Sequence, residues 1–282
     1  MSDTYSFLAR TRSVILDMDG VLYHGTLPLP GAGGFLSFLH RMGIPFLLLT
    51  NNSTLTTEQY TGKLAAMGIG ISEDRILTSA VATGLYLARI APPGAEVYMV
   101  GEEGLRSELE RHGFALGDGA NAQYVVVGFD RHFTFQKMAT AALAVRAGAM
   151  FVGTNPDKTY PSELGLQPGA GAIQAGITAA TDVAPIIVGK PQRAIFELAL
   201  DRLGADTTGA VIVGDRLDTD ILGGQQAGLG TILLLSGVTN PQQLEGSPIV
   251  PDLVYDDLSA LHKDWRNALS GQDPRVRSRC TS

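Results

Sequence analysis

The sequence predicts an α/β fold, in which a doubly wound parallel sheet forms the core and a smaller α/β domain is inserted into it. Short apolar runs alternate with longer amphipathic stretches along most of the 282 residues. The runs are apolar throughout, which is typical of parallel strands that helices cover on both faces. The central part of the chain shows the same alternation by itself, and the length suffices for two modest domains. These observations together favour a core with an insertion.

The apolar runs and the stretches between them place the elements in order. Strands are expected at Val14–Leu16, Pro45–Leu49, Val97–Val100, Tyr124–Val127, Met150–Val152, Ile186–Val188, Ala210–Val213 and Thr231–Leu235. Helices are expected at Thr56–Met67, Phe135–Ala147, Gln192–Leu203 and Asp220–Ala227, where apolar residues recur at helical spacing. Turn residues at 91–94 (APPG) and 181–185 (TDVAP) suit a pair of linkers. We predict a Rossmann-like core at residues 1–80 plus 186–270, an inserted domain at 81–185, and a polar tail at 271–282.

Composition excludes several classes of protein. Hydrophobic residues make up 45% and charged residues 17%, so a sizeable core is expected and disorder is not. The net charge of −7 argues against nucleic acid as a partner but leaves small anionic substrates open. A single cysteine, Cys280, allows no disulfide within the chain and favours a reducing compartment. The N-terminus has no apolar signal segment, and no run approaches the roughly 20 residues that span a bilayer. We therefore expect a cytoplasmic protein without a membrane partner.

Polar residues follow four of the predicted strands. They are Asp17 and Asp19, Thr50 to Ser53, Lys190, and Asp215 with Asp218 and Asp220. Open parallel sheets bind ligands beyond the carboxyl ends of their strands, where the strand order reverses. All these residue types handle phosphate and a divalent cation, so the sequence predicts a phosphate and metal site at this edge.

Asp17 and Asp19 carry the metal prediction. Side chains two apart on a strand point the same way, so the two carboxylates would repel each other and shift each other's pKa. Mg²⁺ relieves such repulsion, because it takes oxygen ligands from one or two carboxylates together with substrate phosphate. Asp215 would add a second carboxylate and the Asp19 carbonyl another oxygen, leaving the Asp19 side chain free for proton transfer. An isolated DxDG, by contrast, is usually only a surface turn.

The other strand ends allow two interpretations each. TNNS offers donors for an anion at the start of a helix, where Ser53 or Thr54 would also serve as the cap. Lys190 would offset phosphate charge, although most lysines are solvated. Asp220 would either support the metal ligands or cap the helix that follows it.

The order of these motifs resembles a known family. DxDGVL, TNNS, GKP and GDRxxTDI, spread over residues 14 to about 260, are similar to the four motifs of the haloacid dehalogenase superfamily. The second Asp of DxD resembles its phosphatase branch. The insertion, which contains GTNPD, resembles the large α/β cap of the NagD-like, or p-nitrophenylphosphatase-like, subfamily.

The resemblance implies roles for individual residues. Asp17 would attack phosphorus and form an aspartyl-phosphate, and Asp19 would act as general acid and base. Phosphate would be bound by Thr50, Asn51, Asn52 and Lys190, and Mg²⁺ by Asp17, Asp215 and the Asp19 carbonyl. Within the cap, the candidates for substrate contact are Thr154, Asn155 and Asp157, although NPD would also suit a plain turn. Arg131 and His132 would meet an anionic leaving group. His24 would either approach substrate or be a surface histidine.

The expected activity is Mg²⁺-dependent hydrolysis of a small phosphomonoester, such as a sugar phosphate, nucleotide, phosphoglycolate, glycerol phosphate or pyridoxal phosphate. One alternative is a phosphomutase of the same superfamily, which would transfer the phosphoryl group to a sugar. Another is a phospho-accepting signalling receiver, which needs only about 100–150 residues and no cap. Members with this cap are often dimers, so a homodimer is also expected.

Overall fold

A computed structural model describes residues 3–162 and 165–271 of the chain. Every strand and helix predicted above is present, with ends shifted by a residue or two. The structure adds elements that are too short or too polar to stand out in the sequence, such as the hairpin of β2 (Tyr23–His24) and β3 (Leu27–Pro28). Residues 272–282 of the predicted tail, Cys280 among them, lie outside the described residues.

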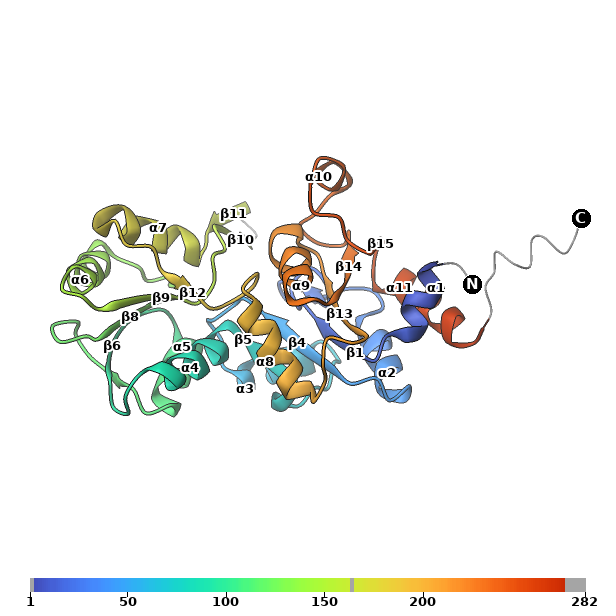
Figure 1. Cartoon of the computed structure of the whole chain (residues 1–282), viewed down its shortest axis with the longest axis horizontal. Coiled ribbons are helices and arrows are strands. Elements are labelled where there is room, and N and C mark those ends of the chain that lie inside the picture. Colours follow the sequence, from blue (N-terminus) through green and yellow to red (C-terminus); the bar gives the residue numbers. More distant parts are fainter. Residues whose placement is uncertain (1–2, 163–164, 272–282) are drawn as a thin grey trace, which may run out of the picture. The chain divides into compact units, whose positions relative to one another are not determined.

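The chain divides into two compact units (Figure 1). Unit 1 comprises Met1–Leu49, Lys63–Ile71 and Phe196–Ser282, and unit 2 comprises Thr50–Gly62 and Ser72–Ile195. The division assigns residues 50–62, 72–80 and 186–195 to the same unit as the predicted insertion. The boundaries of the inserted domain at residues 80 and 185 therefore stay a prediction.

Unit 1 is built on parallel strands in the order β15-β14-β13-β1-β4. Their bounds are β1 Ser13–Leu16, β4 Phe46–Thr50, β13 Ala210–Gly214, β14 Gly230–Leu234 and β15 Leu253–Tyr255. The order reverses at β1, since β4 pairs with one side of it and β13 with the other. All residues of β1, β4 and β13 are buried, which explains their unbroken apolar runs. The switch point of the sheet therefore lies where the sequence places Asp17.

The helices of unit 1 pack through apolar faces. They are α1 Asp3–Arg10, α2 Ala32–Arg41, α9 Leu222–Ala227, α10 Pro241–Glu245 and α11 Leu258–Leu269. Helix α11 contacts both α1 and α2. Asp257 caps α11 by accepting a hydrogen bond from the Ala260 N–H, and Trp265 on its inner face is fully buried against Phe35 and Phe38 of α2. Trp265 thus anchors the last helix.

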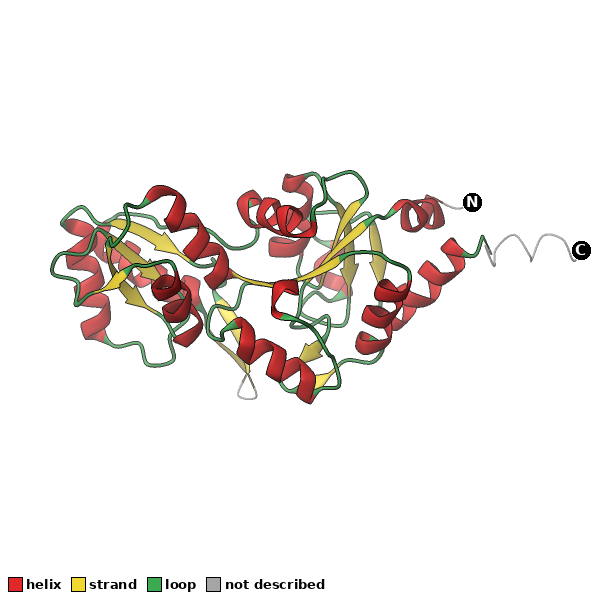
Figure 2. Ribbon diagram, turned by 90° about the horizontal axis from the view of Figure 1, so that it is seen from below, coloured by secondary structure: helices red, strands yellow, loops and turns green. Residues whose placement is uncertain are grey.

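Unit 2 contains a second parallel sheet, in the order β12-β9-β8-β6-β7. Its strands are β6 Glu96–Val100, β7 Ala115–Leu116, β8 Tyr124–Val127, β9 Met150–Gly153 and β12 Ile186–Ile187, and its hairpin consists of β10 Thr159–Ser162 and β11 Gly165–Pro168. The helices are α4 Ser79–Ile90, α5 Glu103–Arg111, α6 Phe135–Arg146 and α7 Ala170–Thr181, with a 3-10 turn at Glu73–Arg75 before β5 Ile76–Thr78. Helices α6 and α7 pack on each other and on the sheet, and α4 packs on α5 (Figure 1). In Figure 2, helices (red) flank the strands (yellow). This is the inserted α/β arrangement that the sequence predicts.

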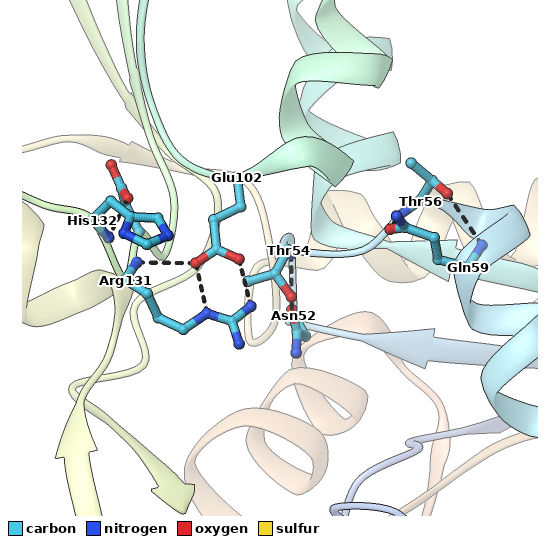
Figure 3. Close-up of polar contacts among 8 residues, drawn as sticks. Asn52, Thr54, Thr56, Gln59, Glu102, Arg131 and His132 are labelled. Atoms are coloured by element: carbon cyan, nitrogen blue, oxygen red, sulfur yellow. Dashed lines mark hydrogen bonds and ion pairs between the residues drawn. The ribbon is translucent and has the colours of Figure 1, made fainter.

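Two helices continue from one unit into the other, α3 (Thr57–Ala66) and α8 (Arg193–Leu203). The predicted cap of α3 at Ser53 or Thr54 is wrong. Thr56 is the capping residue, because its hydroxyl accepts from the Gln59 N–H while the Gln59 side chain accepts from the Thr56 N–H (Figure 3). Among the described residues, no helix combines the length and hydropathy that a bilayer crossing requires.

Candidate active site

Asp17 and Asp215 follow neighbouring strands of unit 1. Strand β1 pairs with β13 in parallel so that Leu16 lies opposite Val213, and the Asp17 N–H donates to the Val213 carbonyl at 2.9 Å. Asp215 comes directly after β13. Because the carboxyl ends of parallel strands meet at one edge, the two acids lie together, as the sequence predicts. Both are buried, with exposed fractions of 7% and 1%.

A third carboxylate, that of Asp220, joins them. Asp17, Asp215 and Asp220 each contribute an oxygen to a cluster in which these atoms lie within 4.8 Å of one another. A π-helical turn at Leu217–Ile221 carries Asp220 back toward the strand end, and its Oδ2 accepts from the Arg216 N–H at 3.1 Å. The prediction that Asp220 caps the following helix is wrong, since α9 has Ile221 at its N-cap and no side-chain cap.

The surroundings of this cluster fit a hard cation. Three buried like charges are costly without a compensating positive charge, and carboxylate oxygens are the ligands that Mg²⁺ prefers. The main chain also closes around Asp215. A methyl group at Gly20 would lie 2.7 Å from its Cγ, one at Gly237 would overlap its Oδ2, and Oδ2 accepts from the Val238 N–H at 2.6 Å. Asp215 is therefore held in one position by glycine backbone, which suits a metal ligand.

Asp19 is not a member of the three-carboxylate cluster, and about half of its side chain is exposed. His24 Nδ1 is 3.8 Å from its Oδ1, and His24 Nε2 lies 2.7 Å from the Ser236 carbonyl, to which it donates. Desolvation raises the pKa of the Asp19 carboxyl and outweighs the opposing effects of Lys63 and His24. A raised pKa suits a group that must carry a proton to a leaving alcohol. His24 is thus a half-exposed histidine that contacts Asp19.

In unit 2, Asn51 joins two strand ends through its side chain. Its Nδ2 donates to the Lys190 carbonyl at 3.0 Å and to Asp157 Oδ1 at 3.1 Å, and its Oδ1 accepts from the Lys190 N–H at 2.8 Å. The Asn51 carbonyl accepts from Ser79 Oγ and Asn155 Nδ2. Because the side-chain amide of Asn51 already hydrogen-bonds to Lys190 and Asp157, we expect Asn51 to contact phosphate through its main chain.

The residues of the GTNPD segment support the same loop. Thr154 and Asn155 are buried, and Asn155 Nδ2 donates to both Thr154 Oγ1 and the Asn51 carbonyl. Asp157 is half-buried and holds the Asn51 amide. Asn155 Oδ1 also accepts from the Asp157 N–H, so NPD does form a turn. Contact between substrate and these three residues stays a prediction.

The remaining predicted phosphate ligands differ in exposure. Thr50 is buried and its hydroxyl accepts from the Asn52 N–H at 3.1 Å. Asn52 is exposed, and its Oδ1 accepts from both the N–H and the hydroxyl of Thr54 (Figure 3). Lys190 is buried and follows β12 by a short turn. The structure thus gathers Thr50, Asn51, Asn52 and Lys190 in unit 2, and the three buried acids in unit 1.

Sequence reasoning missed Ser79 and Gly237. Ser79 is fully buried and bonds the Asn51 carbonyl across 28 residues of chain, and Gly237 lies against Asp215 after β14. A serine at a helix start and a glycine after a strand are too common to attract notice. Their importance lies in contacts that only the folded chain makes.

Comparisons with known proteins show which proteins this chain resembles. The family model described as haloacid dehalogenase-like hydrolase matches residues 14–115, and a HAD-like hydrolase model matches residues 187–261. An acid sugar phosphatase of Staphylococcus saprophyticus is 40% identical, over 90% of this chain and 97% of that protein. The solved structure of NagD from Escherichia coli is 38% identical, covers 88% of this chain and 97% of its own, and has a TM-score of 0.82. A glycerol phosphate phosphatase of Mycobacterium tuberculosis, solved in complex with magnesium, is 33% identical, covers 92% of this chain and 79% of its own, and has a TM-score of 0.85.

Proposed function

The chain belongs to the haloacid dehalogenase-like hydrolases and is a phosphatase of the NagD-like branch, and we propose that it hydrolyses small phosphomonoesters with Mg²⁺ through an aspartyl-phosphate on Asp17. The observation that carries the proposal is the buried cluster of Asp17, Asp215 and Asp220, with the half-exposed Asp19 two residues from its first member. The substrates we propose are sugar phosphates and glycerol phosphate, as the relatives' names indicate.

The reaction divides between the two acids of the first motif. An Asp17 oxygen attacks phosphorus, the bond from phosphorus to the ester oxygen breaks, and Asp19 gives its proton to the leaving alkoxide. Asp19 then takes a proton from water as that water attacks phosphorus, which releases inorganic phosphate and restores Asp17. Desolvation raises the pKa of Asp19, a shift in the direction that favours its acid form.

The other residues stabilise charge and hold position. Asp17, Asp215 and the Asp19 carbonyl would hold Mg²⁺, and the ion supplies positive charge for the phosphoryl oxygens. Asp220, which its bond with the Arg216 N–H holds in place, would support this set, since its carboxylate oxygen lies within 4.8 Å of those of Asp17 and Asp215. Thr50, Asn52, the Asn51 main chain and Lys190 bind the phosphoryl oxygens. Thr154, Asn155 and Asp157 hold the loop that carries them.

The test is release of inorganic phosphate from p-nitrophenyl phosphate and from a metabolite panel, with Mg²⁺ and with excess chelator. We expect Asp17→Asn to lose at least ~10³-fold in kcat. The matched control is Asp218→Asn, the same change at an acid whose side chain is 70% exposed, and it should retain activity. Equal rates for Asp17→Asn and wild type would falsify the nucleophile assignment.

The two alternatives give different results in the same assay. A phosphomutase would transfer the phosphoryl group to an added sugar in place of releasing it. A receiver-like protein would accumulate phosphorylated Asp17 without turnover. The expected homodimer and cytoplasmic location are further proposals, which light scattering of the purified protein and cell fractionation would test.

A further inference from the structure

Unit 2 contains a pocket of about 510 Å³, within the roughly 300–1,000 Å³ usual for small-molecule sites. It lies at the ends of β6 and β8, beside the first turns of α5 and α6. Its charged lining residues are Arg106, Arg131, Lys137, Glu102, Glu103 and Asp130. None of them has a place in the reaction described above.

A partly buried carboxylate, that of Glu102, fixes Arg131 at this pocket. Glu102, whose side chain is 15% exposed, accepts from Arg131 Nε and Nη2 at 2.9 and 2.5 Å and from the Arg131 main-chain N–H at 2.9 Å (Figure 3). Desolvation raises the pKa of the Glu102 carboxyl, but these bonds and the charge of Arg131 together outweigh it, so the net shift is downward and favours the anion. Only two of the five guanidinium N–H groups are used, and no other acceptor among the described residues takes the rest. Arg131 is therefore oriented, with donors to spare.

A second pair repeats the arrangement. Asp130, whose side chain is 1% exposed, accepts from Lys137 Nζ at 2.6 Å and from the His132 N–H at 2.8 Å. The Lys137 side chain is 36% exposed, and its ammonium group has three N–H groups. The pocket thus presents two cations, each paired with a carboxylate, of which Asp130 is buried and Glu102 is partly buried.

The pocket adjoins the loop that carries the proposed phosphate ligands. The Gly104 N–H, two residues after Glu102, donates to the Thr54 carbonyl at 2.9 Å. Gly128, three residues before Arg131, lies so close to Ser53 that a methyl group there would be 2.7 Å from its Oγ. The chain near each member of the Glu102–Arg131 pair therefore contacts residue 53 or 54, which follow Thr50, Asn51 and Asn52.

The net charge of the pocket bears on the kind of group that it would bind. The pocket has three cations and three carboxylates, so its formal charge is zero. Two of the cations, Arg131 and Lys137, already pair with Glu102 and Asp130. A neutral site gives little advantage to an anion, which must lose its hydration to enter. It does offer fixed donors and acceptors, which is what hydroxyl groups require.

We propose that this pocket binds the leaving alcohol of the substrate, that Arg131 and Lys137 donate hydrogen bonds to its hydroxyl groups, and that neutral polyols and sugars are taken in preference to anionic alcohols. The inference rests on the proposed function and makes it more specific. It replaces the sequence-based expectation that Arg131 meets an anionic leaving group.

The test compares three substrates across matched variants. Glycerol phosphate has a neutral leaving group with hydroxyls, phosphoglycolate an anionic one, and p-nitrophenyl phosphate one without hydroxyls. The double change Glu102→Gln with Arg131→Met removes the pair without leaving a buried charge alone. Arg131→Lys keeps the charge but not the planar fork. Arg146→Met removes a cation of the same unit whose bonds go to the Ala180 carbonyl, and serves as control.

We expect wild type to prefer glycerol phosphate to phosphoglycolate in kcat/KM. The double variant should lose roughly 10–100-fold on glycerol phosphate, as for one or two hydrogen bonds to a charged group, and stay within about twofold on p-nitrophenyl phosphate. Arg131→Lys should lose less in kcat/KM on glycerol phosphate than the double variant does, and it should show no loss on the other two substrates. If melting curves show that the double variant is unfolded, Arg131→Lys alone serves as the test of the proposal.

Three results overturn the inference. They are an equal loss on all three substrates, no loss on glycerol phosphate, and a loss that is largest on phosphoglycolate. Wild-type protein that releases no phosphate from any substrate would instead refute the proposed function, so the two failures are distinguishable.

Discussion

Three glycines allow the position of Asp215 to be tested separately from backbone strain. Gly20 has a φ of +82° and lies against Asp215, Gly25 has a φ of +58° and has no atom within 4 Å of an added methyl group, and Gly237 lies against Asp215 without a positive φ. Replacement by alanine therefore combines backbone strain with contact to Asp215 at Gly20, gives backbone strain alone at Gly25, and gives contact to Asp215 alone at Gly237.

The expected magnitudes follow from these differences. A left-handed conformation costs a non-glycine residue roughly 1–2 kcal/mol, so Gly20→Ala and Gly25→Ala should both lower the melting temperature by a few degrees. At Gly20 the new methyl group would lie 2.7 Å from the Asp215 Cγ, where ordinary contact begins at 3.4 Å, so it must also push the carboxylate away by about 0.7 Å. A displacement approaching 1 Å in a catalytic site costs on the order of 10²-fold.

The assay is kcat/KM on p-nitrophenyl phosphate as a function of Mg²⁺ concentration, with melting curves of each variant. Gly20→Ala and Gly237→Ala should lose on the order of 10²-fold in kcat/KM and need more Mg²⁺, while Gly25→Ala should resemble wild type in both. The reasoning is refuted if Gly25→Ala is as impaired as Gly20→Ala, or if Gly237→Ala has normal Mg²⁺ dependence.

Three further predictions concern stability. Burial lowers the pKa of His262, whose Nε2 has no hydrogen-bond partner among the described residues. The unfolded chain therefore binds a proton at this histidine more readily than the folded chain does, and the free energy of unfolding should fall as pH drops below about 6.5. In urea unfolding between pH 7 and 5, His262→Leu should show a weaker fall than wild type. Asn155→Ala removes a donor from the buried Asn51 carbonyl and should cost about 1–3 kcal/mol in the same assay, an unchanged value contradicting the support role. Thr134→Ala removes the hydroxyl that accepts from the Lys137 N–H at the start of α6 and should cost about 1 kcal/mol; Thr140→Ala, within the helix, is its control and should be near neutral.

Some features of the active site could be predicted because they depend on local pattern. An apolar run that ends in Asp17 and Asp19 marks a buried strand and its functional end, and the same holds for the run before Asp215. The sequence of a single strand does not give the order of strands in the sheet. The rule that ligands bind beyond the carboxyl ends of parallel strands was nevertheless enough to predict that these acids lie close together.

Other features depend on contacts between distant residues. The sequence suggests Asn51 as a phosphate ligand, but its amide is occupied by the main chain of Lys190, 139 residues away. The sequence left Asp220 as either a support of the metal ligands or a helix cap, and a π-helical turn brings it to Asp17 and Asp215. The fold decided between these alternatives for Asp220, and it alone set the partners of the Asn51 amide.

The sequence by itself determined the alternation of strands and helices, the family and the identity of the main acids, because periodicity and motif order are properties of short segments. Only the tertiary structure decided which polar side chains are occupied by the protein and which remain available, because buried groups must find hydrogen-bond partners wherever the fold brings them. The Glu102–Arg131 pocket belongs to this second kind, since its partners lie 29 residues apart and meet only when β6 and β8 pair.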